Sequence, residues 1–284
     1  MNLNVYYLAI SGIQKSVRRG LTEQALKCTK IAYEIDRQRL IKRLLVISFE
    51  ECSRDEEILR FLYERPNTKD PKVIEKWITL LATSKFKSSN SVPFCRFLIK
   101  RDTPMEFLDD ELFQELYSDW PEYEFEIYDR HGFPKEKEWI LDICERVYKV
   151  SSEKLQGGVP YCILNADDYP HVDDCEVGEI WNNLIPYSAF DKHTRPGKFA
   201  LNIYKKKHNI NMNSEDFGMY LFNEEGHNTI NRLTFKHDLW KITPFIFNRI
   251  PKKFGLENNQ ELNSIRRWVM EKKFPDETRF LMKS

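Results

Sequence analysis

The sequence is poor in glycine, with ten residues in 284, and it contains long stretches without proline. All-β folds such as sandwiches need many tight turns, and those turns are rich in glycine and proline. The scarcity of both residues therefore argues against a β-sandwich and favours helices. We predict a mainly α fold, a multi-helix bundle with irregular, loop-rich connectors.

Long apolar runs and short cysteine spacings are also missing. No stretch approaches the roughly 18 apolar residues that a transmembrane helix needs. The six cysteines are scattered, without a CxxC pair or another metal-type spacing. Near the N-terminus the basic residues follow the short apolar run instead of preceding it, which is not the order of a secretory signal. We expect a cytoplasmic protein with no membrane partner.

Two catalytic motifs are absent from the 284 residues. There is no GxxxxGK[ST] sequence, the loop that cradles phosphates in P-loop enzymes. The single Gly-Lys pair, Gly197-Lys198, is followed by Phe199 and lacks the upstream glycine. No GxSxG motif of a serine hydrolase is present either. We therefore expect no ATP hydrolysis, no nucleophilic enzyme and no cofactor.

The charges are unevenly distributed, although the net charge is zero. Residues 1–43 hold nine basic residues against three acidic ones, and residues 191–208 hold six against one. Residues 101–130 hold eleven acidic residues against two basic ones. Basic windows of this kind suit a polyanion such as DNA, or self-association through opposite patches. The alternative is that charged helix faces meet within one molecule.

Helical periodicity and helix-end signals predict most of the elements. The first helix covers about residues 4–19 and stops at Gly20, and Thr22 caps a second helix. Asp36 caps a third helix, which is apolar over much of its circumference. Asp70 caps a later helix that has Pro71 at its first position. The further helices are expected near residues 54–63, 70–84, 91–100, 106–117, 135–152, 175–185, 195–208, 214–224 and 258–273.

Irregular segments divide the predicted helices into domains. Residues 118–134 combine proline, glycine, acidic and aromatic residues and have the composition of a connector. We predict an N-terminal helical bundle at residues 1–117 and a C-terminal helical domain at residues 135–284. A second loop, at residues 155–174, lies within the C-terminal domain.

Three segments in order, SGIQKSVRRG, EQALKC and IDRQRLIKRLLVISFEECS, carry a resemblance to a known family. Within residues 1–60 the chain resembles the helical C-terminal region of RarA/MgsA-type, clamp-loader-like AAA+ ATPases. In that family this region forms a collar through which subunits assemble. The matching positions are Ile13, Lys15, Ser16, Val17, Arg18, Ala25, Leu26, Asp36, Arg39, Arg43, Leu44, Ser48, Glu50 and Glu51.

The resemblance implies a role in DNA replication or repair and a homo-oligomer. It also implies that the N-terminal helices bury their apolar faces in a seam between subunits, as a three-helix unit with one largely apolar member would allow. The family's ATPase module precedes this region, whereas the 284 residues contain no P-loop. The resemblance therefore does not imply ATP hydrolysis.

One acidic stretch, NADDYPHVDDCE, could hold a divalent ion. The carboxylates of Asp167 and Asp168 and the imidazole of His171 could bind magnesium or manganese, and such an ion could activate water for phosphodiester hydrolysis. The alternative is a loop that ends in an aspartate cap of a helix beginning near residue 175. Because no known ligand spacing occurs, capping is the preferred interpretation.

The stretch YSAFDKHTRPGK contains the second group of candidate catalytic residues. Asp191 and His193 could orient one another as a general base and its partner, and together with Asp168 they are the candidate catalytic residues. Arg195 and Lys198 could meet a phosphate at the start of the next helix. The alternative, which we prefer, is structural: Thr194 is an N-cap, a proline follows in the first turn, and the histidine is a loop residue.

Basic residues near helix ends, together with the basic residues of the window at 191–208, are candidate DNA contacts. Their contacts would be to phosphates, and hence sensitive to salt and indifferent to base sequence. The candidates are Arg18, Arg19, Lys42, Arg43, Arg195, Lys198, Lys205, Lys206 and Lys207.

The leading hypothesis is a non-ATPase protein of DNA replication or repair that acts by oligomerisation and by binding DNA or a replication or repair protein. The alternative is a metal-dependent hydrolase or nuclease that uses the segments 167–176 and 191–198. The enzyme requires those two segments to converge on one site, whereas the binding protein does not.

Overall fold

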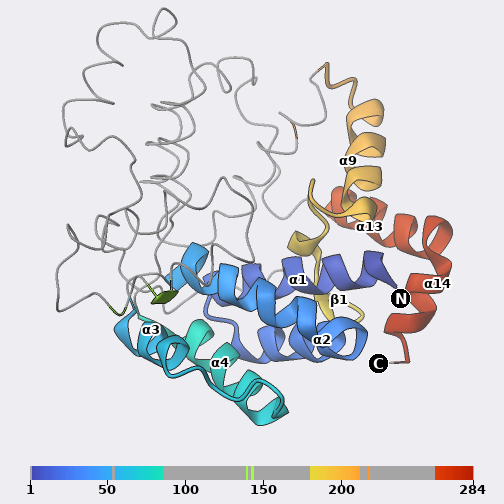
Figure 1. Ribbon diagram of the computed structural model, residues 1–284. Helices are drawn as coiled ribbons and strands as arrows, with labels where there is room; N and C mark the ends of the chain where they lie inside the picture. Colours follow the sequence, from blue (N-terminus) through green and yellow to red (C-terminus); the bar gives the residue numbers. More distant parts are fainter. Residues whose placement is uncertain are drawn as a thin grey trace, which may run out of the picture. The chain divides into compact units, whose positions relative to one another are not determined.

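The fold is described from a computed structural model of the chain (Figure 1). The structure describes residues 2–52, 55–85, 139, 142–143, 180–211, 217 and 260–283. These residues are mainly helical, as the sequence predicts. They belong to two compact units, the first made of residues 1–41, 172–232 and 245–284, and the second of residues 42–171 and 233–244.

Helix α1 spans Leu3–Arg18 and closely matches the predicted helix at residues 4–19. Beyond its end, Gly20 has a φ of 71°. The N–H groups of Gly20 and Leu21 donate to the carbonyls of Val17 and Ser16, at 3.1 and 2.9 Å. These two bonds form a Schellman motif, which needs a left-handed residue and therefore favours glycine. The predicted stop at Gly20 is confirmed.

Helix α2 spans Thr22–Cys52 and is interrupted at Asp36, whose φ of −156° and ψ of 88° are not helical. The Asp36 carboxylate accepts the backbone N–H of Arg39 at 3.0 Å, so it caps the second half of α2 as predicted. The prediction for Thr22 is wrong, because Thr22 is the first helical residue instead of the cap. The carbonyl of Leu21 already accepts the first helical hydrogen bond.

Helices α3 (Glu56–Tyr63) and α4 (Pro71–Thr83) belong to the second unit and confirm the predictions near residues 54–63 and 70–84. Asp55 and Asp70 accept backbone N–H groups of the first turns of α3 and α4. Pro71 stands at the first helical position of α4, where its missing N–H has no cost.

The second unit packs around Trp77 of α4. The Trp77 ring centroid lies 5.9 Å from that of Phe61 on α3. Its indole Nε1 donates to Ser48 Oγ on α2 at 3.0 Å, so the polar edge of the buried ring is satisfied. Ser48 in turn donates to the carbonyl of Leu44 at 2.8 Å.

In the first unit, strands β1 (Ile180–Trp181) and β2 (Ile185–Pro186) form a short antiparallel pair. The helix predicted near residues 175–185 is therefore wrong over its described part. Asn182, Asn183 and Leu184 connect the strands, and the two asparagines have φ values of 50° and 55°. Asparagine tolerates this left-handed region and favours tight turns, a signal that the helical prediction did not take into account.

The rest of the first unit comprises the 3₁₀ turn η4 (Tyr187–Ala189) and the helices α9 (Arg195–Lys207), α13 (Gln260–Lys273) and α14 (Pro275–Leu281). Helices α9 and α13 agree with the predictions near 195–208 and 258–273, whereas α14 was not predicted. Figure 1 shows α14 beside the N-terminal end of α1, where Asn4 donates to Glu277 at 2.7 Å.

The helices predicted near 91–100, 106–117, 135–152 and 214–224 lie wholly or mostly outside the described residues, as do the connector at 118–134 and the domain boundaries beside it. Within the described ranges, α1 packs with segments that the sequence assigned to residues 135–284. No helix in the described part of the chain is long and apolar enough to cross a membrane.

The apolar faces of α1 and α2 are buried within the single chain. Ile13, Val17, Ala25, Leu40 and Leu44 have no exposed surface. A seam between subunits built from these positions, as the resemblance implied, does not agree with this burial. An interface between copies would have to use other surfaces.

Candidate functional site

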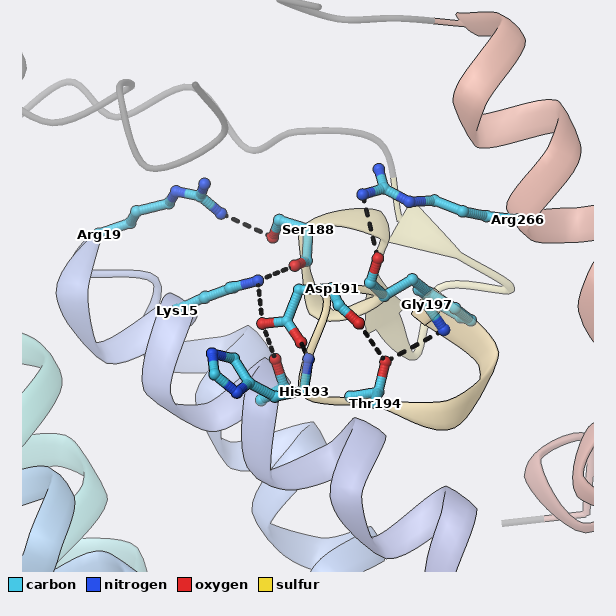
Figure 2. Close-up of polar contacts among 10 residues, drawn as sticks. Lys15, Arg19, Ser188, Asp191, His193, Thr194, Gly197 and Arg266 are labelled. Carbon is cyan, nitrogen blue, oxygen red and sulfur yellow. Dashed lines mark hydrogen bonds and ion pairs between the residues drawn. The ribbon is translucent and has the colours of Figure 1, made fainter. Parts of the chain in front are cut away.

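The candidate site centres on Asp191, in the loop between η4 and α9. Its carboxylate accepts three hydrogen bonds: from Lys15 Nζ at 2.8 Å, from Ser11 Oγ at 3.2 Å and from the backbone N–H of His193 at 2.8 Å (Figure 2). Lys15 and Ser11 belong to α1 and lie one turn apart on the same face. The loop before α9 is thereby fastened to α1 from far along the sequence.

Both charges of the ion pair are buried, since Lys15 is 6% and Asp191 is 3% exposed. Burial by itself would raise the pKa of the Asp191 carboxyl. The charge and hydrogen bond of Lys15, helped by His193, outweigh burial and hold that pKa below its usual value. Asp191 is therefore ionised at neutral pH and paired with an ammonium group.

Two further cations bind η4 and the loop that follows it through neutral oxygens. Arg19 Nη1 donates to Ser188 Oγ at 2.8 Å, and Arg266 Nη2 donates to the carbonyl of Phe190 at 3.1 Å. Lys15 Nζ also donates to the carbonyl of Ser188. Figure 2 shows Lys15 and Arg19 approaching the loop from one side and Arg266 from the other. These contacts fix the backbone of the loop between α1 and α13.

The first turn of α9 is capped and covered by neighbouring residues of its own chain. Thr194 Oγ1 accepts the N–H of Gly197 at 3.2 Å and donates to the carbonyl of Asp191 at 3.1 Å. A Cβ atom added at Gly197 would lie 2.1 Å from that carbonyl oxygen, so the loop passes where a side chain would stand. Pro196 offers no N–H to an anion. The predicted cap at Thr194 and the first-turn proline are confirmed.

The arrangement fits a structural role for Asp191, which holds the loop against α1, better than a role as a general base. A general base must come within hydrogen-bond reach of its substrate. Asp191 is nearly inaccessible, and its oxygens already receive donors from Ser11, Lys15 and His193. The structure does bring Asp191 and His193 together, but the bond between them is made by the backbone amide of His193 and not by its exposed imidazole.

The candidate metal ligands Asp167, Asp168 and His171 lie outside the described residues. Among the residues that the structure does describe, no three His, Cys, Asp or Glu side chains come together in a group that could hold a metal ion. The convergence of 167–176 with 191–198, which the hydrolase hypothesis requires, is not among the described contacts.

The candidate DNA contacts have very different surroundings. Arg195, Lys198 and Lys206 are exposed on α9, whereas Lys205 is partly buried and Lys207 pairs with Glu261 at 2.5 Å.

The candidates on α1 and α2 are less uniformly exposed. Arg19 is buried against the loop, and Arg18 is partly buried. In the second unit Lys42 is exposed, and Arg43 pairs with Glu50 at 3.2 Å. The exposed positive charge of the first unit's candidates is therefore concentrated on α9.

Sequence reasoning missed three participants in the site: Ser11, Ser188 and Arg266. Each lies on a different segment. Ser11 and Ser188 stand in stretches that the sequence analysis singled out, but neither was a candidate residue, and Arg266 belongs to no local motif. Lys15 was singled out only as a position of the family resemblance. A buried arginine such as Arg266, at 2% exposure, carries no signal in its own helix, because its partner Phe190 is 76 residues away.

Comparisons with protein-family models, with curated proteins and with solved structures found no match to this chain. The function must therefore be argued from the chain's own residues.

Proposed function

We propose that this protein binds DNA through the exposed face of α9 and does not hydrolyse it. One observation carries the proposal: Arg195, Lys198, Asn202 and Lys206 are all exposed and follow one another in steps of three or four residues. Residues with this spacing share one face of a helix. Within the described ranges, Arg195, Lys198 and Lys206 form no ion pair with a carboxylate, so their charges are available to a polyanion.

The length of this face suits a nucleic-acid backbone. With a rise of 1.5 Å per residue, the eleven steps from Arg195 to Lys206 span about 16 Å. At 3.4 Å per nucleotide along one strand, that distance corresponds to about five nucleotides. Three phosphate contacts are expected to give a log–log salt slope of about −2.7 on duplex DNA.

The role that we propose is in DNA replication or repair in the cytoplasm, with a homo-oligomer or a replication or repair protein as the further partner. Its support is the N-terminal sequence pattern that resembles the collar of clamp-loader-like ATPases, with any contact between copies made by surfaces other than the buried apolar faces of α1 and α2. Gly20, at the end of α1, is the last residue of the first matching segment, and Asp36, where α2 is interrupted, is the second residue of the third segment. Light scattering of the full chain tests the oligomer, and a monomeric mass at micromolar concentration would remove that part of the proposal.

The experiment for DNA binding uses the full chain and a fluorescent 20-mer, single-stranded and duplex, with anisotropy measured at two salt concentrations. The triple variant Arg195→Gln/Lys198→Gln/Lys206→Gln is expected to bind more weakly and to lose most of the salt slope. A control removes three exposed charges from the second unit, Lys69→Gln/Lys72→Gln/Lys85→Gln, and is expected to bind like the parent.

Two results would contradict this proposal. The first is a parent protein that fails to bind either DNA at low salt. The second is a control that loses as much affinity as the α9 variant, which would mean that net charge alone matters.

The alternative, a metal-dependent nuclease, is tested by adding magnesium or manganese to the same complexes. Cleavage that Asp168→Asn abolishes would favour the enzyme. The buried ion pair of Asp191 favours the binding protein, since it removes that carboxylate from the candidate catalytic residues.

A further inference from the structure

An exposed aromatic ring interrupts the basic face of α9. Phe199 is 41% exposed and lies between Arg195 and Asn202 in the same sequence of three- and four-residue steps. Lys198 is its immediate neighbour in the sequence. The ring thus lies among the cations that we propose to contact phosphates.

The Phe199 ring is supported from within the first unit. Its centroid lies 5.7 Å from that of Phe274, with an angle of 82° between the ring planes, an edge-to-face contact. Phe274 itself is only 5% exposed. The guanidinium of Arg195 lies 5.8 Å from the centroid of the Phe274 ring. Phe199 is therefore held by a buried neighbour while part of its surface remains open to solvent.

From this geometry we infer that the α9 face selects single-stranded DNA, with phosphates on Arg195, Lys198 and Lys206 and one base stacked on Phe199. Unpaired bases offer their flat faces to an aromatic ring, and every base has such a face, so the contact is independent of sequence. Bases inside a duplex are stacked on one another and offer no such face. The inference rests on the proposed function and adds the strand preference to it.

The expected effect is a change in strand preference. Removing one base–aromatic stack weakens single-strand binding by roughly 5- to 150-fold, while duplex affinity, which depends on phosphate contacts, changes by less than about twofold.

The experiment compares full-chain variants on a 20-residue oligothymidine and on a 20-bp duplex at low salt. Phe199→Ala is expected to lose single-strand affinity. Phe199→Leu keeps an apolar side chain against Phe274 but has no ring, and it is expected to lose nearly as much. Phe199→Trp keeps an aromatic stacking surface and is expected to bind single strands at least as well as the parent. Tyr7→Ala removes an exposed aromatic residue of α1 and serves as the matched control.

Four outcomes would overturn the inference. If Phe199→Leu retains the parent's single-strand affinity, the ring is not stacked on a base. If Phe199→Ala weakens both DNAs equally, its effect is on the fold. If the parent shows no strand preference and the charge variant alone loses binding, the proposed function stands without the single-strand preference. A parent that binds neither DNA overturns both.

Discussion

The buried ion pair between Lys15 and Asp191 makes a quantitative prediction for Lys15→Met. At the 2.8 Å separation, the Coulomb attraction is about 6 kcal/mol with an effective dielectric constant of about 20. Desolvation of both ions offsets most of this attraction, so the pair as a whole adds little to stability. Removing one partner is different, because the remaining buried carboxylate loses its opposing charge at a cost of about 3–5 kcal/mol.

Urea unfolding at pH 7, followed by circular dichroism, measures this cost. Asp191→Asn is expected to be destabilising as well, because the buried ammonium of Lys15 then loses its opposing charge. The double variant Lys15→Met/Asp191→Asn should be less destabilised than the sum of the two single variants by about 1–3 kcal/mol. Lys27→Met is the matched control, since it breaks the Lys27–Glu23 ion pair, which has the same 2.8 Å separation but lies on the surface, and it should destabilise the protein far less than Lys15→Met.

The pH dependence gives the prediction a sign. Because the pKa of Asp191 is lowered in the fold, its contribution to stability is fully present above the unfolded pKa of about 3.9. That contribution is lost as the pH falls through the lower, folded value. In Lys15→Met, burial without the ammonium raises the pKa of the Asp191 carboxyl. The difference in the free energy of unfolding between the parent and this variant should therefore become smaller as the pH falls. The reasoning would be refuted if Lys15→Met and Lys27→Met lost equal free energies of unfolding. It would also be refuted if the double variant lost the sum of the two single variants.

Two further predictions concern the backbone. Gly197→Ala should destabilise the protein by about 2–3 kcal/mol, because the new Cβ would lie 2.1 Å from the carbonyl oxygen of Asp191; thermal unfolding beside Lys198→Ala, expected to change little, checks this. Asp36→Ala should lower the free energy of unfolding by about 0.5–2 kcal/mol, because the cap to the N–H of Arg39 is lost. Asp36→Asn should keep most of the capping stabilisation, since an asparagine oxygen can accept the same bond. Equal unfolding midpoints for the two variants would contradict a capping role.

Much of the candidate site could not be predicted from local patterns. The cap at Thr194 and the first-turn proline follow from their own neighbours in the chain and were predicted. The partners of Asp191 were not, because a carboxylate in a loop can equally bind a metal, a histidine or a lysine. The choice of Lys15 follows from packing that brings together residues 176 positions apart. The same limit applies to Arg266 and its contact with Phe190.

The short hairpin at residues 180–186 shows how a local signal can be misjudged. Apolar residues at 180, 181, 184 and 185 have a spacing that a helix also shows. The paired asparagines at 182 and 183 were the competing signal, since both take up positive φ values. A turn there pairs Trp181 with Ile185 across the strands, an arrangement that helical spacing does not reveal.

The sequence by itself determined where several helices begin and end, at Gly20, Asp36, Asp70 and Thr194, because a cap or a left-handed stop is satisfied by backbone groups within a few residues. Only the tertiary structure decided what Asp191 does. Its carboxylate is buried beside the ammonium of Lys15, and burial makes an ion pair the stable state of both groups, since neither charge can be left alone away from water.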